Sequence, residues 1–213
     1  MSTPHSFLPQ KGRYRDLVAF QKAECIYDIT FYFAHHFLER GDRTIDQMIQ
    51  AARSGKQNIA EGTAASTTSR ETEIKLLNVA KASLQELLLD YEDYLRVRDL
   101  EQWSLGSEKA TQARRACWKC NDSAYYREAI KVRPPCTIAN IAITLIHQTD
   151  SLLRKLIEAA KAAFLKEGGI REEMSRARRA TREPSSTKRE SRAPRAIGLI
   201  RPIRLIRPTA PTA

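Results

Sequence analysis

The chain has 213 residues, of which 42% are hydrophobic and 29% charged, and its formal net charge is +11 at pH 7. This length and composition suit one domain with a single core, plus appendages. We expect no secretory signal, because the opening residues lack an apolar stretch. We also expect no membrane-spanning helix, because the apolar run near Ile138 falls far short of the roughly 20 residues that cross a bilayer. Four cysteines in so long a chain do not make a disulfide framework, so we expect a cytoplasmic protein.

The first predicted helix runs from Tyr14 to Glu39. Phe20, Tyr27 and Phe31 share a spacing of three and four residues with neighbouring apolar positions, which is typical of one buried helix face. Glu24 fills the single polar position on this predicted face.

The second predicted helix runs from Thr44 to about Glu61, with Thr44-x-x-Gln47 as a capping box at its start. Its inner face carries small residues. Gly55 in a helix costs about 1 kcal/mol relative to alanine, so we expect a neighbouring helix to approach closely there. Gly62 is expected to cap the end of this helix.

The third predicted helix runs from Ser69 to about Arg98 and is opened by Thr68-x-x-Glu71. Lys81 occupies the polar position of its apolar stripe. Because charges are almost never buried alone, two explanations stand side by side. Lys81 pairs with Glu24 inside the core, or another subunit covers this flank of the protein.

The last predicted helix runs from Thr137 to Gly168. Its apolar seam has the most regular spacing in the chain and consists of Ile138, Ala142, Leu145, Thr149, Leu152, Leu156, Ala159 and Ala163. Residues 99–136 form an insertion, within which Ser107 to Lys119 is expected to be a short basic helix. The predicted fold is therefore all-α: an antiparallel up-down four-helix bundle over residues 14–170, with an insertion between helices 3 and 4 and a flexible N-terminus at residues 1–13.

Residues 171–213 concentrate the positive charge. They hold 12 of the 36 Lys and Arg but only 4 of the 25 Asp and Glu, together with five of the nine prolines and no aromatic residue. We expect this basic, Pro-rich tail to be mostly disordered, because it offers too little apolar surface to offset the entropy of ordering the chain. Such an arm attracts polyanions by releasing their condensed counterions, although many basic tails have no measurable role.

The residues around the end of the second helix form a recognisable motif. The segment Asn58-Ile59-Ala60-Glu61-Gly62 is followed by Ser69-Arg70-Glu71 and an Ala/Leu-rich helix. This arrangement resembles the bacterial four-helix-bundle family first noticed as proteins encoded in intervening sequences of large-subunit rRNA genes. Residues 144–150 and 164–169 are similar to the suffix segment of a subgroup whose fourth helix follows an insertion. The usual proline before the motif is replaced by Lys56-Gln57, so we expect a straighter second helix.

The resemblance implies a helix bundle in which Asn58, Glu61 and Gly62 are structural, as a helix end and its cap. It implies little about biochemistry. A related branch comprises accessory proteins of diversity-generating retroelements, which are pentameric basic bundles that engage a reverse transcriptase and nucleic acid. The resemblance thus favours a homo-oligomer with a nucleic-acid or protein partner.

No residue set in the sequence is typical of catalysis, and we expect neither a cofactor nor enzymatic activity. Cys117-Trp118-Lys119-Cys120 is half of a zinc knuckle, and only Cys136 and His147 follow it. We favour a structural role for these cysteines over zinc binding. The adjacent pair His35-His36 does not chelate from one helix, because neighbouring helical side chains point about 100° apart.

The sequence therefore predicts non-enzymatic binding of nucleic acid, with RNA favoured. The expected phosphate contacts in the tail are Arg171, Arg176, Arg178, Arg179, Arg182, Lys188, Arg189, Arg192 and Arg195. Arg114, Arg115 and Lys119 form a second group. The alternative is a protein–protein adaptor, such as a reverse-transcriptase accessory or scaffold, with an idle tail.

Overall fold

The computed structural model describes residues 14–167, 172, 174, 175, 178 and 179. These residues contain helices and connections but no strand, which confirms the all-α prediction. A short 3₁₀ helix, η1, precedes α1. The elements are η1 (Tyr14–Asp16), α1 (Val18–Phe37), α2 (Thr44–Ala65), α3 (Arg70–Arg96), α4 (Glu108–Lys119), α5 (Ser123–Ala129) and α6 (Pro135–Glu167). None of the described helices has the length and apolarity required to cross a membrane.

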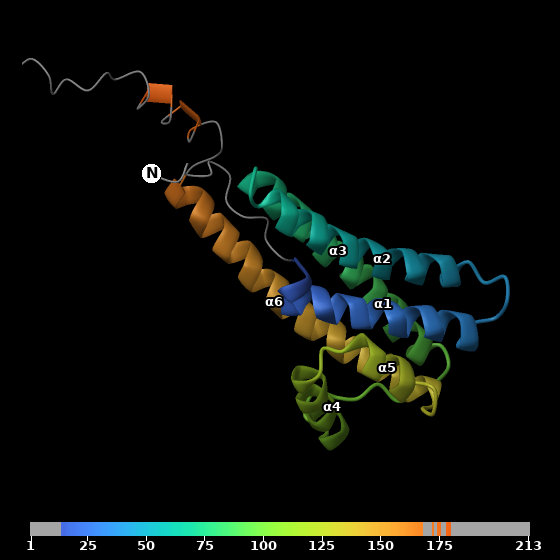
Figure 1. The fold of residues 1–213 in the computed structure, drawn as a ribbon. Helices are drawn as coiled ribbons and strands as arrows, with labels where there is room; N and C mark the ends of the chain where they lie inside the picture. Colours follow the sequence, from blue (N-terminus) through green and yellow to red (C-terminus); the bar gives the residue numbers. More distant parts are fainter. Residues whose placement is uncertain (1–13, 168–171, 173, 176–177, 180–213) are drawn as a thin grey trace, which may run out of the picture. The chain divides into compact units, whose positions relative to one another are not determined.

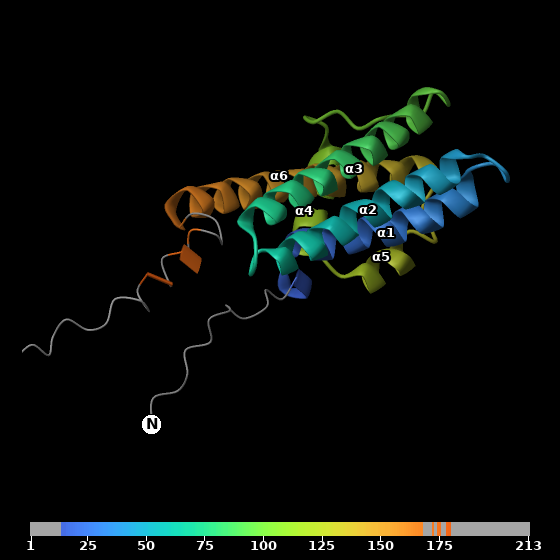
Figure 2. The same ribbon diagram turned by 90° about the horizontal axis from the view of Figure 1, so that it is seen from above.

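The four long helices lie side by side in both views of the ribbon (Figures 1 and 2). Helices α1 and α3 each pack against both α2 and α6. The two short helices lie on one side of this group, α5 against α1 and α4 against α6. As a result, the segment between α3 and α6 covers part of two long helices rather than extending away from them.

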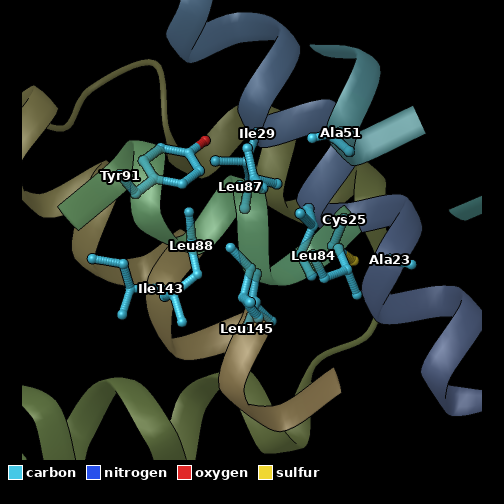
Figure 3. Packing of buried hydrophobic residues seen from close by; sticks show 14 of the residues in the cluster. Ala23, Cys25, Ile29, Ala51, Leu84, Leu87, Leu88, Tyr91, Ile143 and Leu145 are labelled. Carbon is cyan, nitrogen blue, oxygen red and sulfur yellow. The ribbon is translucent and has the colours of Figure 1, made fainter. Parts of the chain in front are cut away.

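The core is built mainly from aliphatic side chains of the long helices, with aromatic residues such as Tyr91 packed among them (Figure 3). Ile29 of α1, Leu84 of α3 and Leu145 of α6 are fully buried there. Gly55 of α2 permits the expected close approach, because a Cβ atom placed on it would lie 2.8 Å from Cδ2 of Leu84. The prediction that a neighbour contacts this glycine is confirmed.

The buried face of α1 agrees only in part with the predicted one, in which Phe20 is buried as expected. Ala19, Ile26 and Phe33 are buried, whereas Phe31 is 47% exposed and Tyr27 is half-buried. Glu24 is likewise not buried. The reason is that α1 contacts α2, α5 and α6, so a wide part of its surface is buried. The spacing of its apolar residues therefore fits more than one choice of buried face.

A different charged residue of α1 is buried instead, namely Lys22. The predicted pairing of Glu24 with Lys81 was wrong. Lys81 lies 3.9 Å from Oδ1 of Asp150 on α6, and Asp150 also binds Arg154 at 2.7 Å. Lys81 of α3 therefore pairs with the carboxylate of Asp150 on the neighbouring helix α6.

The end of α2 also corrects the prediction. The helix continues to Ala65, so Asn58, Glu61 and Gly62 lie inside it and do not form a helix end with its cap. Gly62 is buried against α3, where an added Cβ would lie 3.3 Å from Cβ of Leu76. Packing against α3 thus stabilises the helical conformation at Gly62, although glycine by itself favours the end of a helix.

The capping residues are shifted by one or two positions from the predicted ones. The carboxylate of Asp42, not a Thr44-x-x-Gln47 box, accepts the backbone N–H of Thr44 at 2.8 Å. Ser69, rather than Thr68, caps α3 by accepting the N–H of Thr72. In each case a short oxygen-bearing side chain still satisfies an otherwise unpaired donor of the first turn.

The last helix begins two residues before the predicted start, and only the first half of its predicted seam is correct. Ile138, Ala142 and Leu145 are buried as expected, but farther along Leu153 and Ile157 replace Leu152 and Leu156. Ile138 and Leu156 are 18 residues apart, which is five full turns, so the predicted seam stays on one side of a straight helix. The buried side of α6 instead turns along its length, because the helix packs against both α1 and α3 and these neighbours decide which side is covered.

Candidate nucleic-acid interface

The basic helix predicted for Ser107 to Lys119 corresponds to α4, which runs from Glu108 to Lys119 with Ser107 as its N-cap. The hydroxyl of Ser107 accepts the N–H of Ala110 and caps the first turn. Ala110 and Cys117 are the buried side chains of α4. Its remaining surface carries mostly charged and polar groups, so one face of α4 anchors the helix and the others stay accessible.

Lys22 of α1 fixes the last turn of α4. Its Nζ atom donates a hydrogen bond of 2.6 Å to the carbonyl oxygen of Cys117. A cation at a helix C-terminus is favourable because the unpaired carbonyls there carry partial negative charge. The side chain of Lys22 is fully buried, and desolvation lowers its pKa from the ordinary value. The same ammonium lies 5.5 Å from the ring centre of Trp118.

The exposed side of α4 brings three cations and one aromatic ring together. Arg114, Arg115, Trp118 and Lys119, with Gln148 of α6, line a shallow hollow of about 440 Å³. We call these five residues the cationic–aromatic patch. The ring of Trp118 is 55% exposed. No carboxylate lines this hollow, so within the described part of the chain its charge is positive only.

Gln148 joins the patch to the long helices. Its amide nitrogen donates to the carbonyl oxygen of Arg114 at 2.9 Å, which ties the middle of α4 to α6. Its Oε1 atom is buried without a hydrogen-bond partner among the described residues. The patch therefore rests on a fixed backbone, held by Gln148 at one point and by Lys22 at another.

These groups match the chemistry of a single nucleic-acid strand. Arginine and lysine neutralise phosphates, and an exposed indole provides a face on which a base stacks. Arg114 and Trp118 are four residues apart and Arg115 and Lys119 likewise, so each pair shares one side of the helix. The arrangement places cations on both sides of one aromatic ring.

The structure places the predicted site residues unevenly. Arg114, Arg115 and Lys119 are exposed and adjacent on α4, as a binding surface requires. Arg178 and Arg179 are helical and exposed. The other predicted tail contacts fall outside the described residues: Arg171, Arg176, Arg182, Lys188, Arg189, Arg192 and Arg195.

Three residues of this region were not predicted. Trp118 stands among the cations in the sequence, at a helical spacing from Arg114 and Arg115, and this spacing was the available signal. Lys22 and Gln148 carry no such signal, because they reach α4 from positions 95 and 34 residues away.

Cys136, His35 and His36 each interact with a residue of the same chain. Cys136 donates through its sulfur to the carbonyl oxygen of Glu101 at 3.3 Å, and in the described residues no His, Cys, Asp or Glu side chains group in a way that suits a metal ion. His35 and His36 stack on the rings of Phe31 and Tyr32, with Nδ1 atoms 2.9 and 2.7 Å from the carbonyl oxygens of those residues.

Comparisons of the chain with protein-family models, with curated proteins and with solved structures found no match.

Proposed function

We propose that this protein is a non-enzymatic, oligomeric helix bundle that binds single-stranded nucleic acid, with RNA as the favoured ligand. The observation that carries the proposal is the cationic–aromatic patch. Trp118 is exposed there beside three cationic side chains, and no carboxylate lines the hollow. Covering the exposed indole with a partner is favourable, because it removes apolar surface from water. A nucleotide suits this position, since its base stacks on the ring and its phosphate binds the cations.

The proposed architecture is an antiparallel up-down four-helix bundle of α1, α2, α3 and α6, with α4 and α5 inserted between its third and fourth helices. The cyclic order of contacts, α1 to α2 to α3 to α6 and back to α1, supports this assignment. We also retain the proposal of a relationship to the intervening-sequence protein family, on the strength of the motif from Asn58 to Gly62 and the helix that follows it.

RNA is favoured over duplex DNA by the geometry that the patch requires of its ligand. A base has to be unstacked from its neighbours before it can lie on the indole of Trp118. Single-stranded loops and ends of RNA offer such bases, whereas a regular duplex keeps them paired. The remaining basic residues of the C-terminal segment would add phosphate contacts without sequence preference.

The experiment is a titration of a short, fluorescently labelled single strand with the full-length protein over a range of salt concentrations. Binding through phosphates predicts a linear fall of log K with log salt. Replacing Arg114, Arg115 and Lys119 by glutamine should reduce the slope by about 2, since each single-strand phosphate contact contributes about 0.7.

A matched control removes the same charges elsewhere. Arg43, Arg53 and Lys75 are exposed residues of the α2 and α3 region and do not line the patch. Their triple glutamine variant has the same net charge as the patch variant, and it should keep nearly the full salt slope. Equal slopes in the two variants would reduce the binding to a general charge effect and discard the patch.

The tail contribution is separated by a third variant, in which Arg182, Lys188, Arg189, Arg192 and Arg195 are replaced by glutamine. We expect a further decrease of the salt slope in this variant. A slope that is unchanged would leave the tail without a role in binding.

A protein–protein adaptor is the second candidate function, and one observation favours it. Tyr27, Phe31 and Tyr32 of α1 line a groove of about 640 Å³ together with residues of α5. Exposed aromatic residues are enriched at protein interfaces. The adaptor function predicts that Phe31→Ser abolishes capture of a polypeptide or self-association, with no change in nucleic-acid binding.

The homo-oligomer stays a proposal, with a pentamer as one possible size. The paired Lys81 no longer supports it, since its carboxylate lies in the same chain. The α1 aromatic groove is now the feature in its favour. Light scattering after size-exclusion chromatography measures the subunit number directly, and a monomer at all concentrations would exclude self-association.

A further inference from the structure

A third hollow lies between α4, α5 and the start of α6. It has a volume of about 390 Å³, which falls in the range of small-molecule pockets. We call it the α4–α5 cavity. It shares no residue with the cationic–aromatic patch, because its α4 residues, such as Ala113 and Ala116, lie on another side of that helix.

Three aromatic residues contribute to the walls of the α4–α5 cavity, and one of them, Tyr126, is buried. Trp103, Tyr125 and Tyr126 contribute rings, and Ile130 and Ile141 add aliphatic surface. Tyr126 is buried, donates its hydroxyl to the carbonyl oxygen of Cys120 at 3.3 Å, and contacts Tyr125 edge-on with 5.4 Å between ring centres. A planar ring would therefore find preformed apolar contacts here without rearrangement of Tyr126.

The charges around the cavity select for an anion. Lys109 and Arg133 are its charged lining residues, and no Asp or Glu lines it. Lys109 already binds Glu101 at 2.7 Å. Arg133 uses only its Nε atom, to the carbonyl oxygen of Ala129, and it has no ion pair with any described residue. Its two terminal nitrogens are thus the natural partners for a carboxylate or phosphate.

One further feature agrees with an anionic ligand. Thr137, in the first turn of α6, also lines the cavity, so the positive end of this long helix dipole lies at its wall.

We propose that the α4–α5 cavity binds a small planar aromatic anion, with its ring between the aromatic walls and its carboxylate or phosphate on Arg133. This site is separate from the proposed nucleic-acid interface, and neither requires the other.

The chain carries its own reporter for such a ligand. Cys120 lines the cavity and is half-buried, whereas Cys136 has similar exposure but does not line it. Alkylation by iodoacetamide followed by mass spectrometry measures both thiols in one sample, because trypsin cleaves at Lys119 and separates Cys120 from Cys117. Cys25 and Cys117 are buried, and burial raises the pKa of each.

The probes are 2-naphthoate, 2-naphthyl phosphate and the neutral 2-naphthamide, titrated into the full-length protein by ligand-observed NMR. A fragment of this size in a fitting pocket binds with a Kd of about 1 mM or tighter. At about ten times that concentration, occupancy should slow alkylation of Cys120 by up to tenfold and leave Cys136 unchanged. The better of the two anions identifies the acidic group that the site prefers.

Two variants and a matched control complete the test. Arg133→Gln should weaken the anionic probes by about tenfold or more and leave the amide unaffected. Ala116→Trp should exclude all three probes by filling the hollow. Arg53→Gln removes the same charge from an exposed position of α2 that lines neither the cavity nor the patch, and it should leave the binding of all three probes unchanged. The proposal is overturned if no probe protects Cys120, if Cys136 is protected equally, or if the amide binds as well as the anions.

Discussion

The ammonium of Lys22 lies 2.6 Å from the carbonyl oxygen of Cys117, although 95 residues separate the two in the chain. This contact links the first helix to the end of α4, where the exposed Trp118 and Lys119 are located. A buried lysine is costly, and its position here is explained by the helix terminus that it caps and by the indole that it approaches. The proposed interface thus depends on a residue that is itself inaccessible to any ligand.

Replacement of Lys22 by methionine should destabilise the protein by about 1–3 kcal/mol, because a buried carbonyl then lacks its donor while the apolar volume is kept. Hydrogen exchange should quicken at the N–H of Cys120, which bonds to the carbonyl of Ala116. Lys56→Met is the control: Lys56 is only half-buried and contacts the ring of Tyr27, so its loss should leave exchange in α4 unchanged. Equal exchange rates in wild type and Lys22→Met would show that this contact does not order α4.

Trp118→Ala should weaken single-strand binding by about 1–3 kcal/mol, the amount that stacking on one base contributes. Trp118→Phe should lose less, since it keeps an aromatic face. The salt dependence should stay the same in both variants, because no cation is removed. Fluorescence anisotropy titrations at several salt concentrations measure the affinities of both variants and their salt dependence. Trp103→Phe, which lies outside the patch, serves as the control. An alanine variant with wild-type affinity would contradict the stacking contact.

The stability of the protein should decline at alkaline pH, in part through Cys25. Burial raises the pKa of this thiol from 9.0 to about 12. The folded state therefore holds its proton at pH values where the unfolded state has released it, and the stabilisation that is complete below about pH 9 is lost as the pH rises toward about 12.

Between about pH 9 and about pH 12, Cys25 alone lowers the free energy of unfolding by at most about 1.4 kcal/mol per pH unit. The lowered pKa of Lys22 acts in the opposite direction, since its folded form releases a proton first. Urea unfolding from about pH 8 to about pH 11 under reducing conditions should show a shallower decline in Cys25→Ala than in wild type. Parallel declines would exclude this thiol as a contributor.

Gly55→Ala should destabilise the protein by about 1–3 kcal/mol, although alanine is the better helix former by about 1 kcal/mol. The new methyl group would lie 2.8 Å from Cδ2 and 2.9 Å from Cγ of the fully buried Leu84. Gly62→Ala is the matched comparison, because its nearest contact is 3.3 Å, and it should change stability far less. Thermal unfolding of both variants measures the difference in stability. Adding Leu84→Val to Gly55→Ala should restore part of the lost stability, because it removes the atoms that the new methyl group would meet.

The hydroxyl of Tyr91 donates to Oγ1 of Thr30 at 3.0 Å, and both side chains are fully buried. Thr30→Val should cost about 1–3 kcal/mol, because it leaves the phenol unpaired, while Tyr91→Phe should cost about 1 kcal/mol. The double variant removes both polar groups and should be less destabilised than the two single effects together. A double-mutant cycle from urea unfolding that shows strict additivity would indicate that this bond contributes nothing.

The amino-acid sequence by itself located the four long helices and α4 to within a few residues, but it did not indicate α5. Spacing of apolar residues, oxygen-bearing caps such as Ser107, and the small residue Gly55 are local features, and each has the same meaning in any helical protein. The basic cluster on α4 was likewise visible from its residues alone. Arg114, Arg115 and Lys119 were grouped on this evidence, and the structure places all three at exposed positions of α4, while their role in binding stays a prediction.

Only the tertiary structure decided which residue of a neighbouring pair is buried and which partner it meets. Lys22 rather than Glu24 enters the core because three other helices surround α1, and Lys81 binds Asp150 because α6 is the neighbour that presents a carboxylate. Gly62 lies within α2 because packing on α3 outweighs its local tendency to end a helix. These outcomes depend on contacts between segments far apart in the chain, and such contacts leave no periodic trace in either segment.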